Sequence, residues 1–162
     1  MVHERLAHPF EPVWDENARI LVLGSFPSVR SRENGFYYGH PQNRFWPLLA
    51  RLYGEAVPAD ARERRAFVLG HGVALWDSIE SCRISGSSDA DIRDARPNDI
   101  AWLLQRTNIT RIFCNGQQSF RIFQRFCTSS CPLPAVCLPS TSPANAAWSL
   151  ERLAEAWKII LD

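Results

Sequence analysis

Short apolar runs that alternate with helical segments constrain the fold of this chain more than any other feature. Runs of this kind, each interpreted as a buried strand, cover residues 19–24, 72–76, 111–114 and 134–138. Helices are expected at 44–53, 60–69, 97–106, from Asn115-Gly116 to Phe126 and at 146–161, and a polar loop at 86–94. Strands that are joined through helices form a parallel sheet covered on both faces. We therefore predict an α/β fold, a three-layer α/β/α domain with a central four-stranded parallel sheet, which spans residues 1–162.

Composition places the chain among globular proteins. With 162 residues, of which 46% are hydrophobic and 22% charged, it has the size of one domain and can bury a core. No apolar run approaches the roughly 18 residues of a membrane-spanning helix, and the start MVHERLAHPF lacks the apolar stretch of a signal peptide. We therefore expect a soluble, cytoplasmic protein that does not contact a membrane. Because the formal net charge is +1, nucleic acid would need a local basic patch, for which Arg30, Arg32 and Arg44 are candidates.

The cysteines do not indicate a metal site. There are five, and an odd number in a chain of this composition favours reduced thiols. Cys127 and Cys131 form a C-x3-C pair with Cys137 nearby, but this spacing matches no zinc or iron–sulfur pattern. We therefore expect neither a metal nor another cofactor.

The carboxyl ends of parallel strands meet at one edge of a sheet, where ligands bind in such folds. The segments that follow the predicted strands should lie side by side there, and they contain SFPS, DSIES, NGQQS and STSPAN. They are rich in Ser, Asn and Asp, and the first also carries aromatic residues, among them Phe26 and Tyr38. An exposed ring at this edge can stack on a nucleobase extruded from a duplex. Packing of the same rings against the sheet is the alternative that the residues alone leave open.

The polar residues at this edge have two interpretations each. Asn43 fits the N-cap of the helix at 44–53 and also fits a catalytic amide. Asp77 fits a turn, and as a carboxylate it could accept the ring N–H of uracil or hypoxanthine. The STSPAN turn at 140–145 fits either helix capping or a phosphate site, and Asn115-Gly116 either a turn or an anion site.

Taken in order, these segments resemble the uracil-DNA glycosylase superfamily. The run FYYGHPQNRFW, from Phe36 to Trp46, looks like the F-x-[FY]-x-H-P-x-N-R-F-W run of the mismatch-specific uracil glycosylases. Together with GSFPS at Gly24–Ser28, it is most similar to the hypoxanthine-DNA glycosylase branch of that superfamily. The strand GVALWD and the STSPAN turn correspond in position to the base-reading strand and to the second motif. The resemblance covers nearly the whole chain and implies the fold of that superfamily.

This resemblance implies roles for single residues in the first half of the chain. Asn43 is expected to be the catalytic amide, Tyr38 the ring that stacks on the base, and Asp77 the reader of the base edge. Asp77 replaces an asparagine of the uracil-specific members. Phe26 occupies the position at which most relatives carry the side chain that positions water, so we expect it to bind the base through its backbone N–H.

The second motif departs from the superfamily pattern at two positions. Ser140 replaces a histidine that assists the leaving group, and Ala144 replaces a wedge leucine. We therefore expect the assistance that Ser140 gives to the leaving group to be weaker, or this assistance to come from elsewhere. The residues expected to contact DNA are Ser28, Asn115, Ser142, Pro143, Ala144 and Asn145.

The resulting hypothesis is a monofunctional DNA glycosylase of base-excision repair. It would act as a monomer on double-stranded DNA and hydrolyse the N-glycosidic bond of a flipped deaminated base, hypoxanthine first and uracil second. Lys158, the only lysine, lies outside the four edge segments, which argues against covalent catalysis by an amine. A catalytically inactive nucleic-acid-binding module on the same scaffold is the alternative, because the first-motif acid and the second-motif histidine are both replaced. A domain whose loop aromatics are purely structural also remains open.

Overall fold

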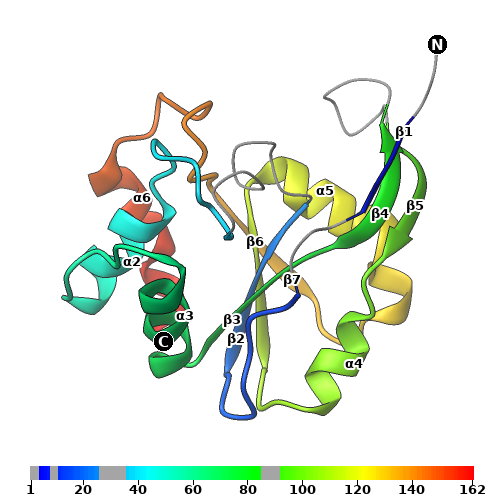
Figure 1. Cartoon of the computed structure of the whole chain (residues 1–162), viewed down its shortest axis with the longest axis horizontal. Coiled ribbons are helices and arrows are strands. Elements are labelled where there is room, and N and C mark those ends of the chain that lie inside the picture. The colour runs from blue at the N-terminus through cyan, green and yellow to red at the C-terminus, as the bar shows by residue number, and fades with distance from the viewer. Residues whose placement is uncertain (1–3, 8–10, 26–35, 85–91) are drawn as a thin grey trace.

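A parallel sheet of four strands forms the centre of the molecule. The computed structural model of the chain describes residues 4–7, 11–25, 36–84 and 92–162. The sheet has the strand order β3-β2-β6-β7, and each neighbouring pair is parallel (Figure 1). Its strands are β2 (Ile20–Gly24), β3 (Val73–Asp77), β6 (Arg111–Asn115) and β7 (Ala135–Leu138). The predicted four-stranded parallel sheet is therefore confirmed, with its strands close to the expected positions.

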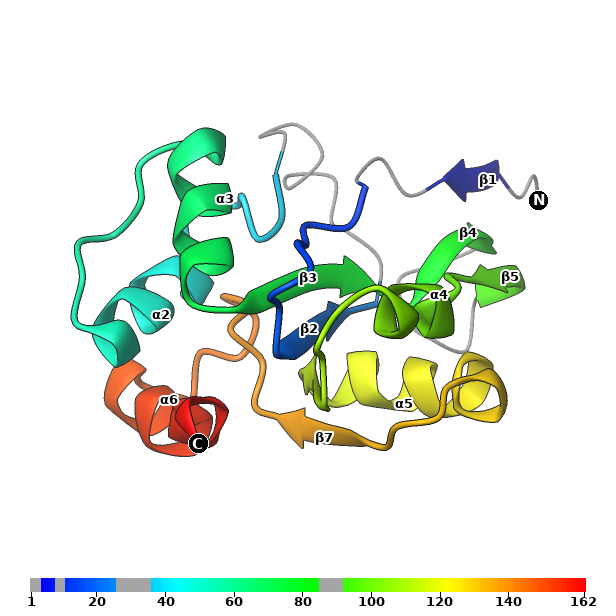
Figure 2. The ribbon, with the colours of Figure 1, turned by 90° about the horizontal axis from the view of Figure 1, so that it is seen from below.

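Helices cover both faces of this sheet. On one side lie α2 (Phe45–Tyr53), α3 (Ala61–Gly70) and α6 (Leu150–Trp157), which is followed by the 3-10 turn η3 (Lys158–Leu161). On the other side lie α4 (Ile100–Gln105) and α5 (Gln117–Phe126), with the 3-10 turn η2 (Thr128–Ser130) after it (Figure 2). Alternate residues of β2 serve the two cores, because Val22 packs with α2 and α6 whereas Leu21 and Leu23 pack with α4 and α5. The three-layer α/β/α prediction is confirmed.

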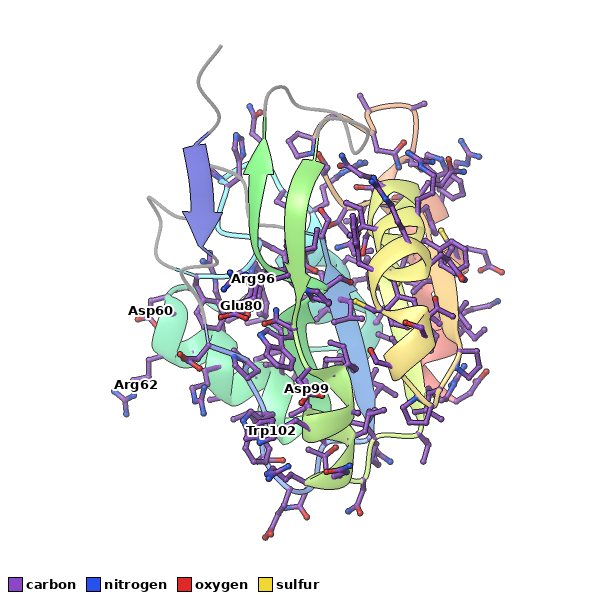
Figure 3. The ribbon with its side chains drawn as sticks, turned by 90° about the vertical axis from the view of Figure 1, so that its right-hand side faces the viewer. Asp60, Arg62, Glu80, Arg96, Asp99 and Trp102 are labelled. Atoms are coloured by element: carbon purple, nitrogen blue, oxygen red, sulfur yellow. The ribbon has the colours of Figure 1, made fainter. Side chains whose placement is uncertain are left out.

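A second, antiparallel sheet was not predicted. It has the order β1-β4-β5 and consists of β1 (Glu4–Ala7), β4 (Ile79–Ile84) and β5 (Ile92–Pro97). The loop expected at 86–94 is therefore wrong for its last part, because 92–94 belong to β5. Strands β4 and β5 are rich in polar residues, and the exposed Glu80 and Arg96 lie on them (Figure 3). Such strands lack the apolar run that reveals a buried strand in a sequence.

Two helices begin later than expected, for identifiable reasons. The helix predicted from Pro97 begins at Ile100, because Pro97 pairs with Ile79 in the small sheet and Asp99 provides the cap by accepting the N–H of Trp102. The helix predicted from 146 begins at Leu150, where Ser149 accepts the N–H of Arg152.

Candidate active site

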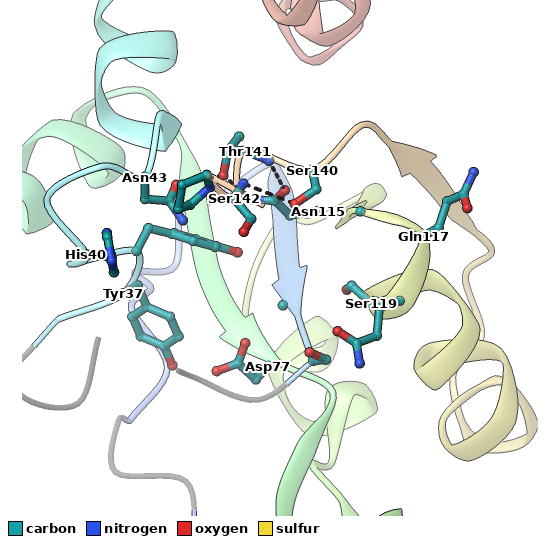
Figure 4. A pocket seen from close by; sticks show the side chains of 16 residues that line it. Tyr37, His40, Asn43, Asp77, Asn115, Gln117, Ser119, Ser140, Thr141 and Ser142 are labelled. Atoms are coloured by element: carbon teal, nitrogen blue, oxygen red, sulfur yellow. Dashed lines mark hydrogen bonds between the residues drawn. The ribbon is translucent and has the colours of Figure 1, made fainter. Parts of the chain in front are cut away.

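A cavity of about 320 Å³ opens at the carboxyl ends of the central strands. This is the edge at which ligands bind in parallel α/β folds, and the volume is at the lower end of the range for small-molecule sites. The described residues that line it include no lysine or arginine. They are Gly24, Ser25, Tyr37, Tyr38, His40, Asn43, Asp77, Asn115, Gly116, Gln117, Gln118, Ser119, Ser140, Thr141, Ser142 and Pro143. Figure 4 shows Asn43, Thr141 and Asn115 in a row along one side, with Asp77 on the other.

The structure brings most of the predicted site residues into this one cavity. They are Tyr38, Asn43, Asp77, Asn115, Ser140, Ser142 and Pro143. Ala144 and Asn145 do not line it; they line an adjoining hollow of about 600 Å³, which shares Gln117, Gln118, Ser140 and Ser142 with the cavity. Phe26 and Ser28 lie outside the described residues. Most of the predicted site residues with described positions thus lie together in one cavity, and two line the hollow beside it; their roles stay predictions.

Asp77 lies at the end of β3 and is only 4% exposed. Burial raises the pKa of its carboxyl to about 8, although a hydrogen bond from the Gly24 backbone acts in the opposite direction. At neutral pH the group is therefore mostly the neutral acid, which can donate a hydrogen bond. The sequence interpretation of Asp77 as a carboxylate that only accepts hydrogen bonds is not supported by this environment.

The backbone at Asp77 and Ser78 is held by Asn98, a residue that sequence reasoning did not connect with the site. Asn98 is buried and donates its carboxamide N–H to the Asp77 carbonyl over 2.7 Å. Its backbone N–H donates to the carbonyl of Ser78 over 2.9 Å. Ser78 in turn donates its backbone N–H to the Gly24 carbonyl over 2.9 Å. The ends of β2 and β3 are therefore fixed relative to each other at the cavity.

Tyr38 combines a packed ring with an unsatisfied hydroxyl. One face of its ring stacks on Phe45, with ring centroids 4.2 Å apart and an interplanar angle of 27°. Its backbone has a positive φ of 54°, which is uncommon for a residue other than glycine. Its Oη is buried and has no hydrogen-bond partner among the described residues. The side chain of Asn115 nevertheless lies near enough to act in the direction that lowers the pKa of Tyr38. Burial is the main cause that raises this pKa, with Asp77 as a second, so the hydroxyl stays protonated.

Asn43 is partly buried, and its carboxamide oxygen is fully used inside the protein. Oδ1 accepts the N–H of Phe45 over 3.0 Å and the hydroxyl of Thr141 over 2.8 Å. Asn43 was predicted as the N-cap of the following helix, but α2 has Arg44 as its N-cap residue, and Asn43 lies one position earlier. Its side chain still accepts the first helical N–H, so the structural and the functional interpretation are compatible at this residue.

The side chain of Arg44 is held by backbone carbonyls of the protein. Its guanidinium donates to the carbonyls of Asn145, over 2.9 Å, and of Ser142, over 3.3 Å, and also to the carbonyl of Trp148. Those bonds hold the loop that leads from β7 to α6. Arg44 thus has a structural role, and a phosphate contact by this residue stays a prediction; Arg30 and Arg32 lie outside the described residues.

Several cavity residues were missed by sequence reasoning. Thr141 is fully buried and contacts both asparagines of the cavity, and Ser119 donates its hydroxyl to the Leu23 carbonyl over 2.8 Å. Both lie in edge segments that the strand rule had identified, so their location was predictable although their contacts were not. Gly116 was predicted as part of a turn or an anion site; it has a φ of 101°, and a Cβ there would lie 3.0 Å from Cβ of Ser140.

Other chemistries find little support in the described part of the chain. No group of three or more His, Cys, Asp or Glu side chains in it is arranged to hold a metal ion. Burial raises the pKa of Cys114 to about 12 and of Cys127 to about 11, so neither thiol is activated as a nucleophile. Among the described helices, none has the length and apolar character needed to cross a bilayer.

Known proteins resemble this chain over nearly its whole length. The family model of the uracil DNA glycosylase superfamily matches residues 11–162. A hypoxanthine DNA glycosylase of Methanosarcina acetivorans is 34% identical over 153 residues, which are 93% of this chain and 95% of the relative. A hypoxanthine DNA glycosylase of Methanosarcina barkeri is 36% identical over 112 residues, 68% of this chain and 71% of the relative. The solution NMR structure of a candidate uracil DNA glycosylase from M. acetivorans superposes with a TM-score of 0.77 at 33% identity and covers 95% of both chains.

Proposed function

The chain belongs to the uracil DNA glycosylase superfamily, and on this premise we propose that it hydrolyses the N-glycosidic bond of a deaminated base in double-stranded DNA, with hypoxanthine preferred and uracil second. One observation carries this proposal: a stacking ring, a neutral acid and a carboxamide N–H share one cavity, and no lysine or arginine is among the described residues that line it. The hypoxanthine DNA glycosylases of two Methanosarcina species are the relatives that favour hypoxanthine.

The flipped base lies against Tyr38 in this proposal. Phe45 covers one face of the Tyr38 ring, which leaves the other face for a base, and Tyr38 lines the cavity. Stacking of a base on an aromatic ring contributes on the order of 1–3 kcal/mol in single-strand binders. Because Phe45 is fully buried, the stack is anchored in the core rather than in a movable loop.

Asp77 recognises the base as a neutral acid. Hypoxanthine and uracil both carry an exocyclic carbonyl, whereas adenine and cytosine carry an amino group at the corresponding position. An O–H of Asp77 can donate to a carbonyl but not to an amino group, so the acid form favours each deaminated base over the adenine or cytosine from which it arises. The Gly24 backbone donates to the Asp77 carboxyl. We propose that the oxygen bonded to Gly24 remains the acceptor and that the other oxygen carries the hydrogen.

Asn43 stabilises the departing base. Since its Oδ1 already accepts two hydrogen bonds, its Nδ2 hydrogens are what it can offer to a substrate. When the N-glycosidic bond breaks, the electron pair stays on the base, and an N–H donor near the ring stabilises that negative charge. Water then adds to the sugar carbon and loses a proton, while the base gains one. Ser140, which lines the same cavity, adds its hydroxyl as a weaker donor to the leaving base.

The hollow beside the cavity receives the DNA around the lesion. It is lined by Ala144, Asn145 and Trp148, and the guanidinium of Arg152 lies 4.2 Å from the Trp148 ring centroid. A polar surface with an aromatic ring and a nearby cation suits an unstacked strand. Asn115, Ser142 and Pro143 lie on the shared rim or in the cavity, where they would contact the flipped nucleotide. Ala144 is too small to wedge a base pair apart, so this loop contributes contacts rather than bulk.

The reaction is monofunctional, and the protein acts as a monomer in this proposal. A bifunctional glycosylase uses an amine to attack the sugar. The only lysine, Lys158, lies in η3 and pairs with Glu155. No amine of a described side chain therefore lines the cavity.

A single-turnover assay tests this function. Purified protein is mixed with duplexes that contain hypoxanthine, uracil, xanthine or only normal bases, and abasic sites are detected by alkaline cleavage. We expect release of hypoxanthine and then of uracil without added metal, no release of adenine, and a loss of release in Asn43→Ala. Asn108→Ala, an exposed asparagine outside the cavity, is the control. Tight binding to inosine-containing DNA with no base release from any duplex would instead identify a binding module.

A further inference from the structure

A chain of hydrogen bonds joins three cavity segments through the side chain of Thr141. Asn115, at the end of β6, donates its Nδ2 to Oγ1 of Thr141 over 3.0 Å, and Thr141 donates that hydroxyl to Oδ1 of Asn43 over 2.8 Å (Figure 4). Asn115 also accepts the Thr141 backbone N–H at its Oδ1 over 3.0 Å. The Thr141 carbonyl accepts the N–H of Arg44 over 3.0 Å. Thr141 is fully buried, so its hydroxyl is shielded from water.

Two backbone N–H groups fix the direction of every bond in this chain. The N–H of Phe45 can only donate, so the atom of Asn43 that faces it must be the oxygen. The backbone N–H of Thr141 likewise requires the oxygen of Asn115, which turns the NH₂ of Asn115 toward the threonine hydroxyl. A hydroxyl has one hydrogen, and with Asn115 as its donor it gives that hydrogen to Asn43. No end of the chain can be reversed without leaving an N–H facing another N–H.

This polarity leaves Asn43 a single orientation. Its oxygen is held by two donors, one from the main chain of α2 and one from Thr141. Rotation of the carboxamide by half a turn would place its NH₂ against both of those donors. The hydrogens of Nδ2 are therefore directed away from them. A carboxamide with one donor fewer could exchange the two orientations at a lower cost, because a net hydrogen bond contributes only about 0.5–1.5 kcal/mol.

We infer that Thr141 is a positioning residue, which locks the carboxamide of Asn43 so that its N–H is presented to the leaving base. This inference rests on the proposed glycosylase function for its catalytic consequence. In this inference Thr141 acts through Asn43 and does not contact the substrate. Asn115 belongs to the same chain of hydrogen bonds, so it has a structural role besides the DNA contact proposed for it.

The variants Thr141→Val and Thr141→Ser separate the hydroxyl from the volume of the side chain. We expect Thr141→Val to lower the single-turnover rate of base release by about tenfold or more, with little change in the affinity for lesion DNA, because both hydrogen bonds of the hydroxyl, from Asn115 and to Asn43, are lost. Thr141→Ser keeps the hydroxyl and should stay within about threefold of the wild type. Thr107→Val is the matched control, since that hydroxyl also donates to one oxygen, the Leu103 carbonyl, and accepts the Ile109 N–H, but at the end of α4. Equal rates for Thr141→Val and the wild type would overturn the inference, as would equal losses for the Val and Ser variants.

An NMR measurement tests the lock without reference to activity. In the wild-type protein, the side-chain NH₂ of Asn43 should show the heteronuclear NOE of a rigid group, in contrast to the exposed Asn108. In Thr141→Val this NOE should fall, and in Thr141→Ser and Thr107→Val it should not. If the Asn43 side chain of the wild type is as mobile as that of Asn108, the inference is refuted. This result needs no variant, so it holds even where Thr141→Val does not fold. If the Asn43 side chain of the wild type is rigid but the protein releases no base, the proposed function fails, whereas the positioning of Asn43 by Thr141 is supported.

Discussion

A Cβ at position 24 would lie 2.2 Å from Oδ1 of Asp77, so the carboxyl group occupies the space that only glycine leaves open. Gly24 and Asp77 are register partners at the ends of β2 and β3, and both line the cavity. A separation below 3 Å cannot be maintained, and Oδ1 belongs to a short, buried side chain that has little room to move. The glycine of the GSFPS motif is therefore explained by the acid beside it.

Gly24→Ala should displace Asp77 and impair the site more than the fold. We expect base release to fall by at least about tenfold, because the proposed recognition of the base carbonyl depends on the position of the acid. Gly70→Ala is the control, since a Cβ there meets nothing within 4 Å. Single-turnover rates and melting temperatures of both variants check this expectation. Normal activity in Gly24→Ala would show that Asp77 need not hold this position.

Base release should depend on the acid form of Asp77. Because burial raises the pKa of this group to about 8, release should be constant near neutrality and fall as the pH rises through about 8. Asp77→Asn keeps one donor and one acceptor without a titrating proton, so it should retain activity and lose this fall. Measurement of single-turnover rates from pH 6 to 10 for both proteins decides the point. A fall of the same shape in Asp77→Asn would assign the titration to another group.

The same pKa predicts a stability difference between the two proteins. Folded Asp77 holds its proton up to a pH of about 8, whereas an unfolded aspartate releases its proton near its ordinary value of 3.8. The folded state thus binds more protons between these values, and the stabilisation by this group, fully present below the lower value, is lost as the pH rises toward 8. Relative to Asp77→Asn, the wild type should lose unfolding free energy at up to about 1.4 kcal/mol per pH unit in this window. Denaturant titrations at several pH values measure the difference, and parallel curves would contradict it.

Asn43→Asp distinguishes a donor from an acceptor at the scissile bond. The aspartate can still accept the N–H of Phe45 and the hydroxyl of Thr141 but offers no N–H to the cavity. We expect it to lose at least as much activity as Asn43→Ala, on the order of 10²–10³-fold, which is typical when a donor to a developing anion is removed. If Asn43→Asp is instead faster than Asn43→Ala, residue 43 acts by accepting a hydrogen bond from the attacking water.

Tyr38→Phe should stabilise the free protein and weaken catalysis. Oη of Tyr38 is buried without a partner in the described part of the chain, and an unsatisfied buried hydroxyl costs about 1–3 kcal/mol. Removal of this hydroxyl should therefore raise the unfolding free energy, while the ring stack on Phe45 is kept. If the hydroxyl is reserved for the substrate, base release should also fall by about tenfold. Tyr53→Phe, which stacks on His71 outside the cavity, is the control for both measurements. An unchanged or lower stability of Tyr38→Phe would mean that the hydroxyl is satisfied in solution.

The central sheet was predictable because its strands are continuous apolar runs, such as Ile20–Gly24, that are buried on both faces. The rule that ligands bind at the carboxyl ends of such strands then located Asn43, Asp77 and Ser140 in one cavity. The small sheet was not predictable, since Ile79–Ile84 carries no periodic pattern and acquires its structure from pairing with β1 and β5. The protonation of Asp77 depends on burial by several segments and also leaves no local signal.

The bonds that Arg44 makes to the loop before α6 all end on backbone carbonyls, which every amino acid carries. The path of this loop therefore does not depend on most of its side chains, including that of the exposed Ala144 at its tip. Under the proposed function, residues at the tip can therefore change to suit different DNA sequences without a change in the path of the loop. The same property offers protein engineers a place to graft new residues beside the candidate active site.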